Sequence, residues 1–363
     1  MKKKIIIDAR FWGPSHTGLG RYSKSLVNSI EKLKPNLDIT LLVNKKPPTR
    51  LKTIPVSAKP YSIKEQLEIP KVLNTHQPDL VHFLHFNTPL LYKKPFVVTI
   101  HDLIKHHSTG LNTTTRSILT YPFKRAGYFK TIKHAVYQSK NILTPSTWVK
   151  KDILKHYKID SSKITVTPES ADQEYFGQTK SKLIPPKFPY LIYIGNAYPH
   201  KNVEALIKVI KQTNLKLVIV TGRDIFYSRL RDQIRKEKAQ DSIKIKGFTS
   251  DRDLKTLLKH SLSFITASLL EGFGLPGLEA MASETIVLAS NKASMPEVYK
   301  NHAIYFAPTN QQDIINKINY VSKLKPSTRQ QLIKQAKQHA STYSWEKTAK
   351  KTIKVYEDCL SLR

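Results

Sequence analysis

Short apolar runs alternate with longer amphipathic stretches along the whole chain. The runs of the first half are Lys4–Ile7, Ile39–Val43, Leu80–Phe83, Phe96–Ile100, Asn141–Thr144 and Ile164–Thr167. Amphipathic stretches with helical spacing, such as Tyr22–Leu33 and Val149–Tyr157, separate them. Runs that are apolar throughout are typical of strands buried on both faces, and their alternation with helices predicts a parallel sheet.

A proline-rich break at Ile184–Pro189 interrupts this pattern, which then restarts. The runs of the second half are Tyr190–Ile194, Leu215–Val220, Ile243–Ile245, Leu262–Thr266, Thr285–Leu288 and Ala303–Phe306. The pattern therefore predicts an α/β protein of two doubly wound, Rossmann-like domains, over residues 1–178 and 188–344. A last helix over 345–363, with Ser344 as a suitable N-cap, is expected to pack back toward the first domain.

Length and composition agree with this division and limit the expected location. A chain of 363 residues exceeds the roughly 250 to 300 residues at which a single core stops growing. No apolar stretch approaches the roughly 18 residues of a membrane-spanning helix, and the basic start lacks a long apolar region before Asp8. The only cysteine, Cys359, excludes a disulfide framework. We expect a cytoplasmic protein, in solution or peripheral at the inner face of the membrane.

The chain is strongly basic, with 60 Lys and Arg against 27 Asp and Glu and a formal charge of +33. Lysine supplies 48 of the 60 and is spread over every segment. Nucleic-acid-binding proteins favour arginine, whose planar guanidinium grips phosphate and guanine, so nucleic acid is not the expected partner. The charge either reflects a lysine-rich bias of the whole proteome or suits an anionic membrane surface or phosphorylated small molecules.

The loop after the first predicted strand is the first candidate for ligand binding. Open α/β sheets bind ligands beyond the carboxyl ends of their strands, so a cleft between the two sheets is the expected site. The loop Ser15–Tyr22 contains Gly18 and Gly20 and opens a helix, which suits an anion. Ser23 stands where a dinucleotide-binding fingerprint has its third glycine, so that alternative is weakly supported.

Two other strand ends carry polar residues. His101 and Asp102 follow Phe96–Ile100. Asn196 follows the first strand of the second domain, five residues ahead of Lys201 at the start of a helix. By the same strand-end rule, these side chains are candidates for ligand contacts.

The most distinctive segment reads SLLEGFGLPGLEAMA, from Ser268 to Ala282. Glu271 and Glu279 flank a glycine-rich turn, and Pro276 suits the first turn of a helix. A strand-to-helix turn alone explains the glycines and the proline, but not two acids near one helix start. Ionised carboxylates accept charge-assisted hydrogen bonds from sugar hydroxyls and stabilise an oxocarbenium-like centre, so the segment indicates carbohydrate chemistry.

The segment Glu271–Glu279 resembles the paired-glutamate motif of retaining glycosyltransferases with the GT-B fold, specifically family 4 (group 1). The resemblance extends over nearly the whole chain through TGLGRYS, HDL, TPSTWVKKDI, IGNAYPHKN, GFTSDRDL and SWEKTAKKTIKVYE. The stretch Asn196–Asn202 is similar to a mannosyltransferase-like branch of surface-polysaccharide and glycolipid assembly. The implied architecture is two Rossmann-like domains that face a central cleft.

The resemblance also implies roles for individual residues. The second domain would bind a GDP- or UDP-linked sugar and the first an acceptor, with His101, Glu271 and Lys201 as catalytic residues. The implied donor-binding residues are Gly18, Gly20, Asn196, Lys201, Arg223, Phe248, Glu271, Gly272, Phe273, Gly274 and Glu279. Lys201 would face the diphosphate, Glu271 the transferred sugar and Glu279 the ribose. Arg21 and Tyr22 are expected to contact the acceptor.

No metal and no other cofactor are expected. Asp251-Arg252-Asp253 matches the metal-binding Asp-x-Asp of another glycosyltransferase fold, but Ser250 with Asp253 forms a capping box at a helix start. His106-His107 and His134 lack a third ligand at convincing spacing. Asn196 stands where the family often has an arginine, so Lys201 would carry more of the diphosphate charge.

We therefore expect retaining transfer of a hexose, foremost mannose, from a nucleoside-diphosphate sugar to a glycan or lipid-linked acceptor. A glycosyl phosphorylase or a sugar-nucleotide epimerase would share the fold, and a nucleic-acid-binding protein would account for the charge. Residues 113–140 combine aromatic and basic side chains, with Pro122 interrupting any single helix. We expect there a helical pair or a mobile segment, which either packs in the ordinary way or contacts an anionic membrane.

Overall fold

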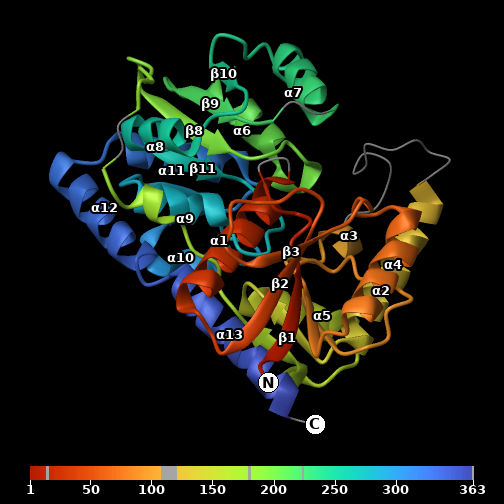
Figure 1. The fold of residues 1–363 in the computed structure, drawn as a ribbon. Helices are drawn as coiled ribbons and strands as arrows, with labels where there is room; N and C mark the ends of the chain where they lie inside the picture. Colours follow the sequence, from red (N-terminus) through yellow and green to blue (C-terminus); the bar gives the residue numbers. More distant parts are fainter. Residues whose placement is uncertain (14–15, 108–120, 179–180, 223–224, 362–363) are drawn as a thin grey trace. The chain divides into compact units, whose positions relative to one another are not determined.

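The computed structural model describes residues 1–13, 16–107, 121–178, 181–222 and 225–361 (Figure 1). The chain divides into two compact units. The first unit comprises Met1–Leu103, Ser117–Glu169 and Ser344–Arg363, and the second comprises Ile104–Arg116 and Ser170–Tyr343. Besides the segment that begins at Ile104, the chain leaves the first unit after Glu169 and returns to it at Ser344.

Among the described residues, the first unit contains a seven-stranded parallel sheet in the order β3-β2-β1-β4-β5-β6-β7. Its strands are β1 Lys3–Asp8, β2 Leu37–Val43, β3 Lys52–Pro55, β4 Leu80–Phe83, β5 Phe96–Thr99, β6 Asn141–Thr144 and β7 Ile164–Val166. The strand order reverses between β1 and β4, which are paired from Ile5 with Leu80 onward. This reversal is the topological switch point at which such sheets bind ligands.

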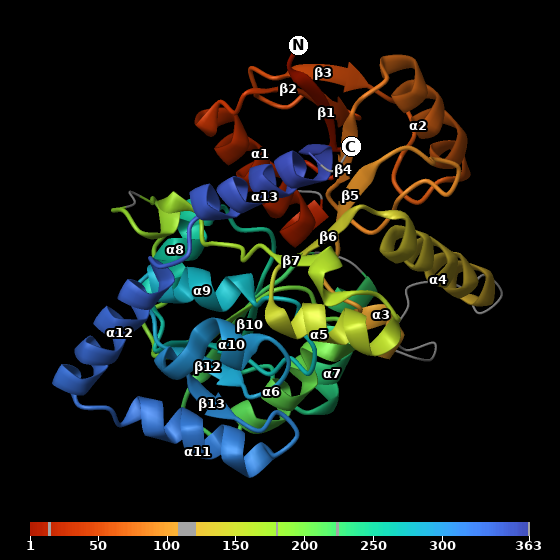
Figure 2. The same ribbon diagram turned by 90° about the horizontal axis from the view of Figure 1, so that it is seen from below.

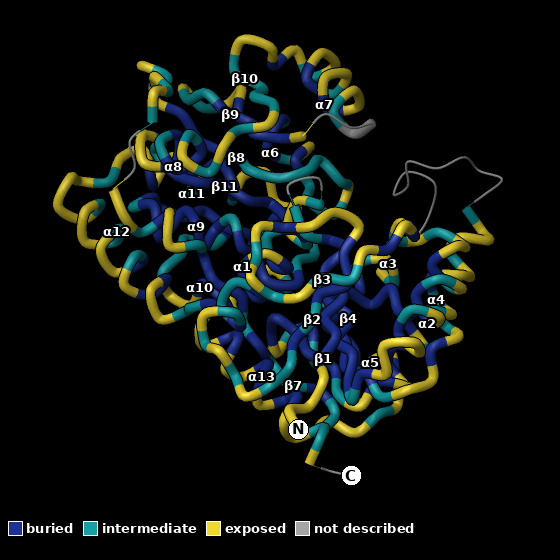
Figure 3. Tube along the Cα trace, viewed as in Figure 1, coloured by how far each residue is buried: buried dark blue, intermediate teal, exposed yellow. Residues whose placement is uncertain are grey.

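Helices cover both faces of the first sheet. They are α1 Thr17–Leu33, α2 Ile63–His76, α4 Tyr121–Gln138, α5 Thr147–His156 and α13 Trp345–Ser361, with a 3₁₀ turn at Ser161–Lys163. Alternate strand residues face opposite apolar layers, as the pleat of a strand requires. Ile6 and Val98 belong to the layer with α2, α4 and α5, whereas Ile7 and Val97 belong to the layer with α1 and α13. The strands are accordingly among the most buried segments (Figure 3).

The described part of the second unit contains a six-stranded parallel sheet in the order β10-β9-β8-β11-β12-β13. Its strands are β8 Tyr190–Ile194, β9 Lys216–Val220, β10 Ile243–Lys246, β11 Ser263–Thr266, β12 Val287–Ser290 and β13 Ile304–Phe306. The order reverses between β8 and β11, so this sheet has its own switch point. The fold class predicted from the sequence is confirmed.

Two helical layers also enclose the second sheet. The helices are α6 Val203–Ile210, α7 Ile225–Lys236, α8 Asp251–His260, α9 Leu275–Ala282, α10 Met295–Tyr299, α11 Gln311–Ser322 and α12 Pro326–Ala340, with 3₁₀ turns at Gln173–Tyr175, Pro199–Lys201 and Lys300–His302. The second unit also includes the short helix α3 Ile104–His107. Residues of α8, α9 and α12 share one apolar cluster with one face of the sheet. Residues of α6, α7 and α11 share the other.

All twelve predicted strands are present, but the edge strand β3 was not predicted. Its four residues, Lys52–Pro55, contain a single large apolar side chain, and none of these four residues is buried. An edge strand pairs on one side only, and a proline is tolerated there. The local pattern therefore lacks the continuous apolar run that identified the central strands.

The last helix completes the first unit from the other end of the sequence. Residues of α13, including Trp345, Ile353 and Tyr356, join the apolar layer that α1 forms on its sheet (Figure 2). Ser344 caps this helix, since its Oγ accepts the backbone N–H of Lys347 at 3.1 Å. The face of β1 and β4 is thus covered by helices more than 300 residues apart in the chain.

A buried chain of polar groups crosses this layer. Tyr356 Oη lies 2.6 Å from His82 Nδ1, and His82 Nε2 lies 2.8 Å from Thr99 Oγ1, which in turn lies 3.1 Å from Tyr22 Oη. His82 is completely buried. Burial disfavours the charged imidazole and lowers the pKa of His82 to about 3. The histidine is therefore neutral and joins α1, β4, β5 and α13 through hydrogen bonds.

The segment around Pro122 differs from the expectation. Residues 113–120 lie outside the described residues, and from Tyr121 onward α4 is one continuous helix. Pro122 stands in its first turn, where a missing N–H costs no helical hydrogen bond. It therefore does not interrupt the described helix.

His82 makes the stability of the first unit depend on pH. Its pKa is about 6.5 in an unfolded chain and about 3 in the folded one, so only the unfolded chain gains a proton as the pH falls through this window. We expect the free energy of unfolding to fall by up to about 1.4 kcal/mol per pH unit from this group below pH 6.5. His82→Gln should reduce the slope between pH 6 and 4 by about one proton, measured by urea unfolding. An unchanged slope would contradict the prediction.

Candidate functional site

The predicted site residues lie at the carboxyl ends of the strands that flank the two switch points. In the first unit, Gly18 and Gly20 follow β1, and His101 follows β5. In the second unit, Lys201 follows β8 and Glu271 follows β11. Because β8 and β11 are neighbours and parallel, their ends lie at the same edge of the sheet. Each unit therefore carries its own group of candidate residues.

Gly18 and Gly20 of the first loop differ in whether the structure has room for a side chain at their positions. A Cβ atom at residue 20 would lie 1.9 Å from the backbone oxygen of Gly13, so only glycine allows α1 to approach this loop. A Cβ atom at residue 18 would meet no heavy atom within 4 Å. Among the described residues, no side chain caps the start of α1, and Thr17 there has a φ of 48°. The helix therefore starts at a β-branched residue in a strained left-handed conformation.

His101 is held by two hydrogen-bond acceptors of the first unit. Its Nδ1 lies 3.1 Å from Glu169 Oε1, and its Nε2 lies 3.1 Å from the backbone oxygen of Leu84. The His101 and Glu169 side chains are 12% and 10% exposed. The ring of Tyr22 meets the imidazole edge-on, with centroids 4.5 Å apart. His101 is therefore oriented on three sides and still reaches the surface.

The predicted acceptor contact of Tyr22 does not fit its position. Tyr22 is 1% exposed, and burial raises the pKa of its phenol. Its hydroxyl pairs with Thr99, and its ring packs between His101 and Trp345. Tyr22 supports His101 from within the core. Arg21, the other predicted acceptor residue, is partly exposed on α1.

In the second unit, Lys201 and Glu271 form an ion pair, with Nζ and Oε1 2.5 Å apart. Their side chains are 21% and 14% exposed, so the pair is partly dehydrated. Ser268 Oγ also donates to Glu271 Oε1 at 3.0 Å. A backbone hydrogen bond of 2.7 Å from Leu269 N to His200 O ties the two loops together. The sequence assigned the two residues to different parts of a donor, whereas the structure joins them.

The glycine-rich turn before α9 is built around one tyrosine. A Cβ atom at residue 274 or 277 would lie 2.5 or 2.3 Å from the hydroxyl oxygen of Tyr299. Gly274 also has a φ of 92°, and the Tyr299 hydroxyl donates a short hydrogen bond to its backbone oxygen. Ser294 Oγ donates to the backbone oxygen of Glu271 at 2.9 Å, which fixes the start of the turn. Packing therefore accounts for both glycines, and the turn holds Glu271 in place.

The remaining predicted donor residues differ widely in exposure. Gly272, Phe273 and Glu279 are buried, with Glu279 only 1% exposed inside α9. Asn196 is partly exposed at the end of β8. Phe248, just beyond β10, is 82% exposed, an unusual position for a phenylalanine. Arg223 lies outside the described residues.

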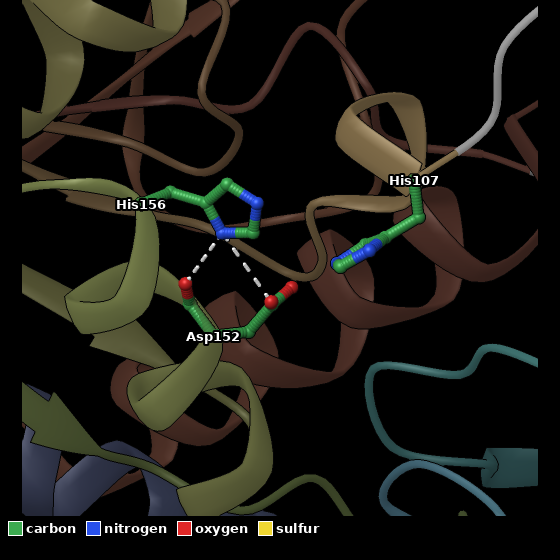
Figure 4. Close-up of side chains that lie close together, drawn as sticks. All are labelled: His107, Asp152 and His156. Carbon is green, nitrogen blue, oxygen red and sulfur yellow. Dashed lines mark hydrogen bonds and ion pairs between the residues drawn. The ribbon is translucent and has the colours of Figure 1, made fainter.

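The acidic and histidine clusters have structural partners. Asp251 accepts a hydrogen bond of 2.9 Å from Tyr175 Oη, and Asp253 accepts one of 2.5 Å from Ser181 Oγ. In the first unit, His156 Nδ1 lies 3.4 Å from Asp152 Oδ1 and 2.9 Å from its backbone oxygen (Figure 4). His107, also labelled there, belongs to the second unit, so we assign no metal site to the three side chains.

Sequence reasoning did not identify Glu169 as a site residue. It stands 68 residues from His101 in the sequence. One signal was available, because Glu169 follows β7 at the same edge of the sheet as the other candidates.

Two families match the chain in succession. Glycosyltransferase Family 4 matches residues 40–175, and glycosyl transferases group 1 matches residues 174–339. The O-antigen chain mannosyltransferase RfbU of Salmonella typhimurium is 31% identical over 250 residues, which are 68% of this chain and 65% of that relative. The O-antigen chain mannosyltransferase B of Escherichia coli is 25% identical over 94% of this chain and 96% of its own length.

A solved structure shares the whole fold. HepE of Anabaena, crystallised with UDP-glucose, superposes with a TM-score of 0.72 at 14% identity, over 99% of this chain and all of that one. At this identity, the similarity concerns the fold.

The two glycines of the first loop make a matched pair of variants. Gly20→Ala should lower the free energy of unfolding by about 1 to 3 kcal/mol, because the new methyl group meets backbone that cannot turn away. Gly18→Ala should leave stability unchanged or raise it by up to about 1 kcal/mol, since it adds helix propensity and meets no atom. Denaturant unfolding of both variants checks this, and equal destabilisation would contradict it.

Proposed function

The chain belongs to the group 1 glycosyltransferases of family 4, and from that premise we propose that it transfers a hexosyl unit, foremost mannose, with retention at the anomeric carbon. The donor is a GDP- or UDP-linked sugar, and the acceptor is a glycan or lipid-linked sugar of surface-polysaccharide or glycolipid synthesis. The two O-antigen mannosyltransferases among the relatives support mannose and the polysaccharide acceptor. The UDP-glucose held by HepE supports a nucleotide-sugar donor.

The ion pair of Lys201 and Glu271 is the observation that carries this proposal. A diphosphate that approaches Lys201 competes with Glu271 for the ammonium group, because both are anions. When the phosphate binds the lysine, Glu271 keeps the Ser268 hydrogen bond and can accept a hydroxyl of the transferred sugar. Donor binding thus prepares the carboxylate to face positive charge at the anomeric carbon.

Other residues complete the donor contacts in this proposal. Lys201 and the start of α9 supply positive charge and N–H dipoles to the leaving diphosphate, and no metal ion is required. Phe248, exposed beyond β10, faces the nucleobase. Asn196 and the backbone of Gly272, Phe273 and Gly274 contact the diphosphate and sugar, and Glu279 contacts the ribose. The leaving phosphate oxygen takes the acceptor proton.

A transfer assay tests the activity. The protein is incubated with GDP-mannose, UDP-glucose or ADP-glucose and a mannose- or glucose-terminated acceptor, and release of nucleoside diphosphate and glycan product is followed. We expect product from one donor only, with the anomeric configuration of the donor retained in the proton NMR spectrum of the product. Product of inverted configuration would contradict the retaining mechanism. Hydrolysis or no reaction with every donor would contradict the transfer.

Lys201→Ala tests the diphosphate contact. It should lose about 2 to 4 kcal/mol of transition-state stabilisation, measured as kcat/KM, because one fixed positive charge is removed. Lys208→Ala is the matched control: Lys208 also pairs with a glutamate, at 3.0 Å, but is 38% exposed on α6. We expect the control to retain activity within about twofold. Equal activities of the two variants would refute the role of Lys201.

We also propose that α4 contacts an anionic membrane. Its exposed side carries Phe123, Lys124, Lys130, Lys133 and Tyr137, and Phe123 is 81% exposed. Basic side chains near an anionic surface and an aromatic side chain at its interface both favour binding. None of the described helices is long and apolar enough to cross a membrane.

Liposome sedimentation tests this contact. Binding to vesicles with anionic lipid should exceed binding to neutral vesicles and fall as salt rises. Lys130→Gln/Lys133→Gln should weaken it by about 2 kcal/mol, at about 1 kcal/mol per lysine. The control Lys323→Gln/Lys325→Gln removes the same charge from exposed positions beside α11 and α12. Equal losses in both variants, or equal binding to both lipids, would contradict a contact through α4.

A further inference from the structure

His101 and Glu169 form a contact to which the family assignment gives no role. His101 follows β5, and Glu169 follows β7 as the last residue before the chain enters the second unit. Their side chains are nearly buried, and the Nδ1–Oε1 distance is 3.1 Å. Both residues belong to the first unit, so the contact is independent of where the second unit lies.

The partners of His101 restrict where its hydrogen atoms can be. Glu169 Oε1 and the backbone oxygen of Leu84 are both acceptors, one at each ring nitrogen. A neutral imidazole donates from one nitrogen only, so both hydrogen bonds together require hydrogen on both nitrogens. The carboxylate is the stronger acceptor of the two because it is charged. The contacts therefore match a ring with hydrogen on both nitrogens, in which Nδ1–H is donated to Glu169 and Nε2–H to the Leu84 carbonyl.

We propose that Glu169 is the positioning residue of His101. Its carboxylate accepts a hydrogen bond from Nδ1–H and thereby orients Nε2 toward the substrate. The Leu84 carbonyl oxygen pairs with Nε2 until a substrate oxygen replaces it. A carboxylate that fixes one imidazole nitrogen and thereby sets the other is a recurring arrangement in enzymes. The inference rests on the proposed sugar transfer, in which the Nε2–H of His101 donates to an oxygen of the transferred hexose. Glu169 itself touches no substrate.

The surroundings of Glu169 fix its position. Thr348 Oγ1 of α13 donates a short hydrogen bond to the backbone oxygen of Pro168. Lys351 Nζ donates to the backbone oxygen of Val166 at 3.4 Å. The same helix places Trp345 against Tyr22, whose ring meets His101 edge-on. The loop that carries Glu169 and the ring that supports His101 are thus both anchored to α13, as a positioning role requires.

The first unit also contains a matched control. His156 and Asp152 form a second histidine–carboxylate pair, on α5, with His156 Nδ1 3.4 Å from Asp152 Oδ1 (Figure 4). The Asp152 side chain is 5% exposed and the Glu169 side chain 10%. This pair lies within one helix and is no part of the candidate site. Asp152→Asn therefore removes the same charge from a comparable environment without affecting His101.

The test combines nitrogen NMR with kinetics on the full-length protein. Histidine is labelled with ¹⁵N, and the His101 ring is assigned by its loss in His101→Gln. We expect hydrogen on Nδ1 in the wild type. In Glu169→Gln we expect hydrogen on Nε2 alone, because the glutamine amide can donate to Nδ1. In the transfer assay Glu169→Gln should lower kcat about 10- to 100-fold with the donor KM within twofold. Asp152→Asn should keep both constants.

The outcomes separate this role from a structural one. The same His101 ring state in the wild type and Glu169→Gln, or equal kcat losses in Glu169→Gln and Asp152→Asn, would overturn the proposal. If Glu169→Gln does not fold, Glu169→Asp retains the charge at a shorter reach. It should then keep hydrogen on Nδ1 and recover part of kcat, and a wild-type kcat with a changed ring state would refute the proposal. Failure of the wild type to transfer sugar would refute the proposed function, whereas the NMR result would still decide the pairing.

Discussion

A partly dehydrated ion pair between Lys201 and Glu271 is the interaction on which the candidate chemistry depends. Opposite charges attract more strongly where water is partly excluded than in bulk water. Lys201 therefore leaves Glu271 only when another anion replaces the carboxylate. The parallel pairing of β8 and β11 brings the two side chains to one edge of the sheet. The bonds from Ser268 to the Glu271 carboxylate and from Ser294 to its backbone hold the glutamate. In the proposed function, an anionic ligand displaces Glu271 from this pair.

In the first unit, the surrounding residues hold the His101 side chain near the surface in one orientation. Tyr356, His82, Thr99 and Tyr22 form a buried polar chain that ends beneath the His101 ring. The chain begins on α13, the last helix of the sequence. The position of His101 therefore depends on residues far beyond the second unit in the chain, and loss of α13 would remove both the support of Tyr22 and the anchor of the Glu169 loop.

Most of the fold could be predicted because buried parallel strands are apolar throughout. The strand-end rule indicated Lys201 and His101 as candidates, and the glycine-rich motif indicated Glu271. The pairing of Lys201 with Glu271 was not predictable, since 70 residues separate them and only the sheet order makes them neighbours. The burial of Tyr22 was not predictable, because a glycine-rich loop indicates a ligand but not which following side chain turns inward. Glu284 occupies a glycine-like position with a φ of 61°. Ion pairs to Lys337 and Lys259 hold it there, and they lower the pKa of its carboxyl to about 2.

Calorimetric titration of a free nucleoside diphosphate into the wild type, Lys201→Ala, Glu271→Gln and the double variant tests the competition at the ion pair most directly. The ligand carries no sugar, so Glu271 can act only through Lys201. Removing the Glu271 charge should strengthen binding while Lys201 is present and have no effect once Lys201 is gone. This corresponds to a coupling energy of about 0.5 to 3 kcal/mol. Additive effects of the two substitutions, with no coupling, would contradict the account.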